Sequence, residues 1–363
     1  MPEKPTLYGI KNSNRKSEDF WGKNQFNSSF PVALACYMRD KKINAVYLRL
    51  NEKLEVEADE LPFSDVFNTT SPNSELYFSF ESKFEPYQKY SHDDIGGIDL
   101  VVMTANRDYL RPFEVKLTVI PDNATAKRPE EKWGSEIVFR PATTKYCALG
   151  IIDSLQDRLE WVREMFEPSC HDMQDWGNGY EISRKLPRLL DALDELERGA
   201  IDRQKPFLMQ PIWKTEGKSP HLAQNALDVF IWSDLALSRL FLDASKENIK
   251  DISHNKITRQ MRSAARMARF FYHASTSGMV PLKKIYTEMA FGKQTDKEFA
   301  VNGTVTAGYM KSSRRIRPIV ERTALKKIIL NGGEKILSPE RRFDQTVYFT
   351  IVTADKTLAA RDG

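Results

Sequence analysis

Residues 96–122 read GGIDLVVMTANRDYLRPFEVKLTVIPD, and this segment is the most informative part of the sequence. Two runs within it, at 96–103 and 111–122, have the length and the apolar, β-branched composition of strands. Two glycines open the first run and Pro-Asp closes the second, as expected at strand ends. The few residues between the runs serve as a short connection. The stretch therefore predicts two neighbouring strands of a sheet.

The flanking sequence predicts an α/β architecture, in which a mixed central sheet is flanked by helices. A long amphipathic helix at 143–166 follows the strands and covers the sheet. A later helix has Ser183 as its cap, Pro187 in its first turn and Gly199 at its end. The remaining predicted elements are strands at 43–50, 136–141, 206–213 and 346–354, and helices at 21–39, 222–244 and 256–274.

Composition limits the classes to which the chain belongs. Its 363 residues are 41% hydrophobic and 29% charged, which suits a globular protein with a sizeable core. No run of about 18 apolar residues is present to span a membrane, and the N-terminus has no secretory signal. The three cysteines, Cys36, Cys147 and Cys170, form no CxxC pair, which argues against a zinc ribbon or a disulfide framework. We expect a reduced, cytoplasmic protein.

Positive charge is concentrated in one segment. Residues 246–327 hold 18 Lys or Arg against 6 Asp or Glu, a net of +12, whereas the whole chain has a net charge of +4. A basic segment in an otherwise acidic chain is typical of a surface that binds a polyanion.

Asp99, Glu114 and Lys116 form a candidate catalytic group on the two central strands. Glu114 and Lys116 are two residues apart, so the period of a strand places both on one face of the sheet. Pairing with the preceding strand brings Asp99 beside them. Carboxylates bind Mg²⁺, and a nearby lysine orients water and neutralises charge on a phosphate. The set fits metal-dependent phosphodiester hydrolysis.

The acidic-x-Lys pattern alone is weakly specific, because it occurs at five places in the chain. Only the copy at 114–116 lies between apolar residues and follows, after 15 residues, an aspartate inside another apolar run. Charged groups in such surroundings are costly unless they are paired or bind something. Two alternatives stay open. One is a site built from Asp65, Glu81 and Lys83, and the other is an ordinary strand pair whose carboxylates pair with Lys116 in water.

GGIDLVVM followed by PFEVKLTVIPD resembles the Asp…Glu-x-Lys core of type II restriction endonucleases of the PD-(D/E)xK superfamily. With LYGIKNSNR and FWGKNQFNSSFPVALACYM near its start, most of the chain resembles the HindVP-type restriction endonuclease family. The resemblance implies a PD-(D/E)xK core with Asp99, Glu114 and Lys116 as catalytic residues. Asp99 and Glu114 would be the metal ligands, and Mg²⁺ the cofactor, with Mn²⁺ as a substitute.

The same resemblance implies cleavage of double-stranded DNA at a short palindrome of the GRCGYC kind, in a prokaryotic cell that also makes a cognate DNA methyltransferase. No stable complex with that methyltransferase is expected. A palindrome favours a two-fold homodimer with one active site per strand. Many PD-(D/E)xK enzymes also have a glutamate on an early helix. Here that helix offers Asn24, Gln25 and Asn27 instead, which leaves the number of metal ions open.

The basic segment is the expected DNA-recognition region. We expect residues 1–245 to form the catalytic core with its N-terminal helix, and residues 246–363 a largely helical basic region packed on that core as one unit. Arginines spaced by three and four residues form a stripe on the helix at 256–274, and a second group lies in a loop-like run. The candidates are Arg259, Arg262, Arg266 and Arg269 for phosphates, and Arg314, Arg315 and Arg317 for base edges.

Three functions are compatible with these features. The first is a type II restriction endonuclease, and the second is another PD-(D/E)xK nuclease that acts in repair or on a DNA structure. The third is a DNA-binding protein without catalysis, in which the charged strand pair is only structural. Metal-dependent cleavage separates the third from the others, and discrete fragments separate the first from the second.

Overall fold

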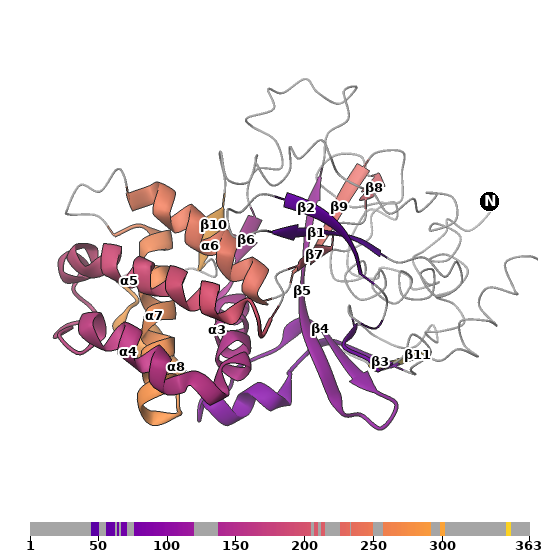
Figure 1. Cartoon of the computed structure of the whole chain (residues 1–363), viewed down its shortest axis with the longest axis horizontal. Coiled ribbons are helices and arrows are strands. Elements are labelled where there is room, and N and C mark those ends of the chain that lie inside the picture. Colours follow the sequence, from indigo (N-terminus) through magenta and orange to yellow (C-terminus); the bar gives the residue numbers. More distant parts are fainter. Residues whose placement is uncertain are drawn as a thin grey trace, which may run out of the picture.

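The structure, a computed structural model, separates its strands from its helices, with a large sheet on one side and a helical body on the other (Figure 1). The α/β class is therefore as predicted. The structure describes residues 45–50, 56–61, 64, 67–70, 76–119, 137–204, 207–209, 212–214, 226–232, 234–249, 257–291, 298–301 and 346–349. The predicted helix at 21–39 lies outside these residues.

The main sheet has nine strands in the order β11-β3-β4-β5-β9-β7-β1-β2, with β8 also paired to β9. Every pairing between described strands is antiparallel, so the prediction of a mixed sheet is wrong for this part of the chain. β4 and β5 are joined by a short turn, which allows only an antiparallel pair, because a parallel pair needs a long crossover connection. The strands are β1 (Ala45–Leu50), β2 (Val56–Leu61), β3 (Leu76–Ser82), β4 (Ile98–Thr104), β5 (Tyr109–Val119), β7 (Phe207–Met209), β8 (Ile212–Lys214), β9 (Ala226–Trp232) and β11 (Thr346–Phe349).

The central strands agree with the sequence prediction. The run at 96–103 contains most of β4, the run at 111–122 overlaps most of β5, and residues 43–50 contain β1. The predicted strand at 136–141 exists as β6 (Ile137–Phe139), but it pairs with β10 (Phe299–Val301) in a separate two-stranded sheet. The sequence at 206–213 forms β7 and the start of β8 rather than one strand.

Two segments that were each predicted as one helix are not single helices in the structure. The helix expected at 143–166 is two helices, α3 (Pro141–Ser154) and α4 (Leu159–Cys170), joined through Leu155 and the short η4 (Gln156–Arg158). The single helix expected at 222–244 is wrong, because its first part forms β9 and only the rest belongs to α6 (Asp234–Ile249). A short apolar run such as ALDVFIW fits a buried strand as well as a helix, and periodicity does not separate the two.

Helix α5 (Gly179–Ala200) begins earlier than predicted. Asn178 is its cap, since its side chain accepts hydrogen bonds from the amides of Tyr180 and Glu181. Ser183, predicted as the cap, lies inside the helix and donates to the carbonyl of Gly179. Pro187 consequently falls in the helix interior rather than in its first turn.

Helix α7 (Arg259–Ser277) lies within the helical body and packs against α3, α4, α5 and α6. Its residues 261–271 are all buried, including three arginines, which fits a helix surrounded by others. The same hydrophobic core includes residues of η2 (Glu85–Tyr90), β4 and α8 (Leu282–Glu288). Among the described helices, none has both the length and the apolar character needed to cross a membrane.

Candidate active site

Asp99 and Glu114 lie on the neighbouring strands β4 and β5. Leu100 of β4 lies opposite Phe113 of β5, and the register continued by one residue places Asp99 opposite Glu114. Residues directly opposite in an antiparallel pair have Cβ atoms about 4.5–5.5 Å apart. Figure 1 shows β4 and β5 side by side, and a register continued in this way would agree with the predicted closeness of the two residues.

Glu114 is the more buried of the two acids. Its exposed fraction is 7%, whereas Asp99 is partly buried. The hydroxyl Oγ1 of Thr143, at the start of α3, donates a hydrogen bond to Glu114 Oε1 across 3.0 Å. A buried carboxylate needs such partners, because an uncompensated charge away from water is costly. Thr143 was not identified from the sequence.

β5 also carries Lys116, which lies two residues beyond Glu114 and opposite Phe230 of β9. β5 extends beyond the start of β4, and its residues 114–119 pair along the other edge with β9. Both members of the Glu-x-Lys pattern therefore belong to one regular, centrally placed strand.

The donor set fits a hard divalent cation. Within the described residues no group of three or more His, Cys, Asp or Glu side chains is arranged to hold a metal. Asp99 and Glu114 offer carboxylate oxygens alone, and Mg²⁺ usually binds to one or two protein carboxylates and keeps several waters. Two neighbouring carboxylates are therefore sufficient for Mg²⁺, whereas a zinc site would require more protein ligands.

Asp234 is a third acid near this site that sequence reasoning missed. It opens α6 directly after β9, and its Oδ2 accepts a hydrogen bond from the hydroxyl of Tyr87 across 3.3 Å. Burial raises the pKa of Asp234 to about 7; Arg111 lowers it and nearby Glu114 raises it. The strand-to-helix junction at 232–234 is the signal that would have found it, but the prediction of one helix over 222–244 concealed that junction.

The alternative site at Asp65, Glu81 and Lys83 gains no support. The side chains of Asp65 and Glu81 lie outside the described part of the structure. Lys83 Nζ is 3.2 Å from Asp94 Oδ1 and 3.7 Å from Glu85 Oε1, so its ion pairs are made with neighbours outside that set.

A family model described as HindVP restriction endonuclease matches residues 21–352. The chain belongs to this restriction endonuclease family. The resemblance inferred from the sequence is confirmed, and the protein is a site-specific deoxyribonuclease. No solved structure gives a significant match.

Two similar proteins extend the likeness over nearly the whole chain. The type II restriction enzyme HgiDI of Herpetosiphon aurantiacus is 38% identical over 349 residues, which cover 95% of this chain and 96% of that protein. The probable type II restriction enzyme HindVP of Haemophilus influenzae is 37% identical over 350 residues, which cover 96% and 94%.

The arginine stripe of this HindVP-family enzyme is not exposed as expected. Arg262, Arg266 and Arg269 have exposed fractions of 3%, 5% and 4%. Arg266 pairs with Glu298, Arg269 pairs with Glu288, and Arg262 donates to a backbone carbonyl at 3.4 Å. The expected exposed surface is therefore absent at these three positions.

The other four DNA-contact candidates stay predictions. Arg259 is partly exposed at the start of α7. Arg314, Arg315 and Arg317 lie outside the described residues, as do Asn24, Gln25 and Asn27.

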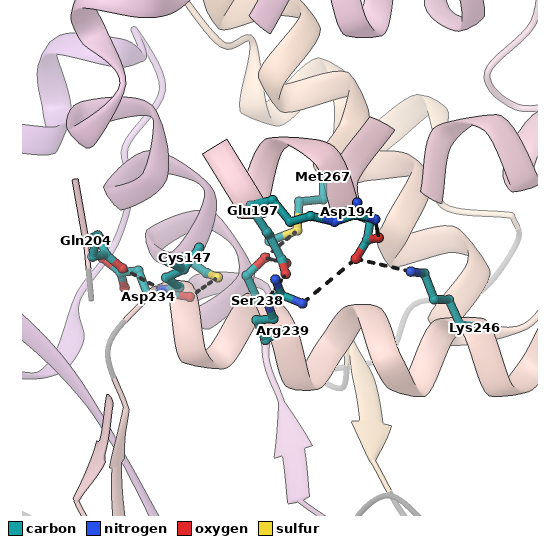
Figure 2. Close-up of polar contacts among 11 residues, drawn as sticks. Cys147, Asp194, Glu197, Gln204, Asp234, Ser238, Arg239, Lys246 and Met267 are labelled. Carbon is teal, nitrogen blue, oxygen red and sulfur yellow. Dashed lines mark hydrogen bonds and ion pairs between the residues drawn. The ribbon is translucent and has the colours of Figure 1, made fainter. Parts of the chain in front are cut away.

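A second charged cluster lies between α5 and α6 (Figure 2). Arg239 Nε is 3.2 Å from Glu197 Oε2, and the Ser238 hydroxyl donates to Glu197 Oε1. Asp194 lies beside this pair and 3.2 Å from Lys246 Nζ. The cluster joins two helices inside the helical body and includes none of the candidate catalytic residues, so we regard it as structural.

An open groove of about 710 Å³ lies beside α7 and α8. The described residues that line it include His92, Asp93, His273, Lys283 and Glu288, but not Asp99 or Glu114. The groove therefore does not include these two candidate catalytic residues.

Proposed function

We propose that this enzyme cuts both strands of double-stranded DNA at a short palindrome, with Asp99, Glu114 and Lys116 as its catalytic residues and Mg²⁺ as its cofactor. The observation that supports the proposal is the pairing of β4 and β5, whose register, continued by one residue, would set Asp99 beside the buried Glu114. The β3-β4-β5 meander followed by α3 supports a PD-(D/E)xK core.

Each residue has a role that follows from its chemistry. Asp99 and Glu114 would hold the cation through carboxylate oxygens. The alternation of β5 assigns Lys116 to the face of Glu114, where an ammonium group orients the attacking water and offsets charge on the phosphate. Bound Mg²⁺ supplies Lewis acidity to the phosphoryl group. Hydrolysis adds one water across a P–O bond, so one new end keeps the phosphate and the other gains a hydroxyl.

The wider biological setting is also a proposal, which rests on the family to which the chain belongs. We propose a two-fold homodimer that reads a palindrome of the GRCGYC kind, with one active site on each strand. A methyltransferase of the same specificity would protect the host DNA in the same cytoplasm. Residues 246–363 would supply most DNA contacts, in particular Arg314, Arg315 and Arg317.

Digestion of one plasmid of known sequence in Mg²⁺ tests the proposal. We expect discrete fragments, with sequenced ends that all fall at one short palindrome. A smear would favour a less specific nuclease of the same superfamily. Binding without cleavage, in Mg²⁺ or Mn²⁺, would contradict the proposed metal-dependent cleavage.

A further inference from the structure

Glu114 accepts a hydrogen bond from Thr143, a residue of helix α3 that has no role in the proposed function. Thr143 Oγ1 donates to Glu114 Oε1 across 3.0 Å, and Thr143 has an exposed fraction of 3%. An ionised carboxylate only accepts hydrogen bonds, so the hydroxyl must be the donor. The contact joins β5 to the first turn of α3.

The first turn of α3 is held in place by two other parts of the chain. Pro141, its first residue, has a carbonyl that accepts a hydrogen bond from the Tyr286 hydroxyl of α8 across 3.3 Å. Just before it, the Phe139 carbonyl accepts from the amide of Glu298 across 2.8 Å. These two bonds tie the start of α3, which carries Thr143, to α8 and to the residue before β10.

We infer that Thr143 is a positioning residue, which orients the Glu114 carboxylate for cation binding; the inference rests on the catalytic role proposed for Glu114. A carboxylate has about four acceptor sites, so a bond from Thr143 leaves it able to bind a cation. Groups that hydrogen-bond a metal ligand set its orientation, and their removal typically lowers metal affinity or activity by about 10- to 100-fold.

The chain offers a matched control in the next residue. Thr144 is as buried as Thr143, with an exposed fraction of 3%. Among the described residues, its hydroxyl has no hydrogen-bond partner. Valine has nearly the shape of threonine and lacks the hydroxyl, so Thr143→Val and Thr144→Val make the same change in the same helical turn. Only the first removes a bond to Glu114.

The experiment compares full-length Thr143→Val, Thr143→Ser and Thr144→Val with the unmodified enzyme. Calorimetric titration of Ca²⁺ into the enzyme bound to its cognate duplex measures cation affinity without cleavage. The Mg²⁺ concentration for half-maximal cleavage gives a second measure. Thermal unfolding without metal checks the fold, and Thr143→Ala replaces Thr143→Val if the valine variant does not fold.

We expect Thr143→Val to weaken Ca²⁺ binding and raise the half-saturating Mg²⁺ concentration by about tenfold or more. Thr143→Ser, which keeps the hydroxyl, should restore both values, and Thr144→Val should match the unmodified enzyme. Equal cation affinity in Thr143→Val and Thr144→Val would overturn the inference. A fall in cation affinity in Thr143→Ser equal to that in Thr143→Val would also overturn it, because the hydroxyl would then not matter.

A Glu114→Gln arm separates this inference from the proposed function. If Glu114→Gln cuts DNA normally, the catalytic assignment itself fails. If Glu114→Gln is inactive but Thr143→Val binds cations as the unmodified enzyme does, only the positioning role of Thr143 fails.

Discussion

Arg266 and Glu298 form a buried ion pair, with Nη1 2.7 Å from Oε1 and side-chain exposed fractions of 6% and 1%. The Arg266 guanidinium also lies 4.7 Å from the ring centre of Tyr286 and donates to the carbonyl of Met289. Arg266 therefore joins α7 to α8 and to the residue that precedes β10. Its position explains why a regular arginine spacing need not mark a DNA-binding face.

Arg266→Met should lower the free energy of unfolding by about 3–5 kcal/mol, because it leaves the Glu298 carboxylate buried without its partner. The double variant Arg266→Met with Glu298→Leu should recover most of that stability. Denaturant unfolding measures both values. Arg266→Met could instead be as stable as the unmodified protein and show a shallower salt dependence of DNA binding. That result would show that Arg266 contacts DNA.

Arg314→Ala, Arg315→Ala and Arg317→Ala should weaken DNA binding without a comparable fall in stability. Removal of a phosphate contact should weaken binding to all sequences and lower the salt slope by about one. Removal of a base contact should cost about 1–3 kcal/mol on the cognate site alone. Affinities for cognate and scrambled duplexes over a salt series distinguish these results.

Arg203→Ala is the matched control for that series, because Arg203 is an exposed arginine bonded to Asp157 of the helical body. It should leave affinity and salt slope unchanged. If none of the three changes at 314–317 differs from Arg203→Ala, the DNA contacts must be made by another surface.

His273 should make stability depend on pH. Burial lowers the pKa of His273 to about 4, with Arg269 and Lys284 lowering it further and Glu288 opposing them. Between pH 4 and about 6.5 the unfolded chain therefore binds more protons than the folded one, so stability falls as the pH falls. His273→Gln should remove about 2 kcal/mol of the decrease between roughly pH 7 and 5. An unchanged decrease would contradict this assignment.

Cleavage should require a divalent cation. Mg²⁺ or Mn²⁺ should support cutting and an excess of chelator should stop it, since the carboxylates of Asp99 and Glu114 would otherwise have no cation to hold. Ca²⁺ accepts the same oxygens with looser geometry and should support DNA binding without cleavage. Gel electrophoresis and gel-shift assays measure the two activities. Full cleavage in excess chelator would argue against the proposed chemistry.

The centre of the sheet was predictable because local signals agreed there. Strand-length apolar runs, bounding turn residues and a two-residue spacing were enough to assign Asp99 and Glu114 to neighbouring strands from the sequence alone. β9 was not predictable, because the run at 226–232 is mostly apolar and carries no clear alternation. The missed strand also hid Asp234, whose place near Glu114 depends on long-range packing.

The sequence pattern also could not predict that Arg262, Arg266 and Arg269 are buried. A helix whose arginines recur at three and four residues looks amphipathic when considered alone. In the fold, Glu288 and Glu298 come from later parts of the chain and pair with the arginines of that face. Thr143 was missed for a similar reason, since its contact with Glu114 joins residues 29 apart on different elements.

Asp99→Ala, Glu114→Ala and Lys116→Ala should each abolish cutting while the unfolding midpoint stays near that of the unmodified enzyme. The carboxylate changes remove cation binding, and the lysine change removes the group that orients water. Lys116→Ala should still bind its site specifically, which a gel shift in Ca²⁺ would show.

The most direct measurement is the single-turnover cleavage rate of Glu114→Ala on a duplex that carries the cognate site, in saturating Mg²⁺. The burial of Glu114, its place opposite Asp99 and its bond from Thr143 predict no detectable cleavage by a folded, DNA-binding protein. Cleavage near the unmodified rate would contradict the assignment of the active site to β4 and β5, and Glu81 would then be the residue to replace.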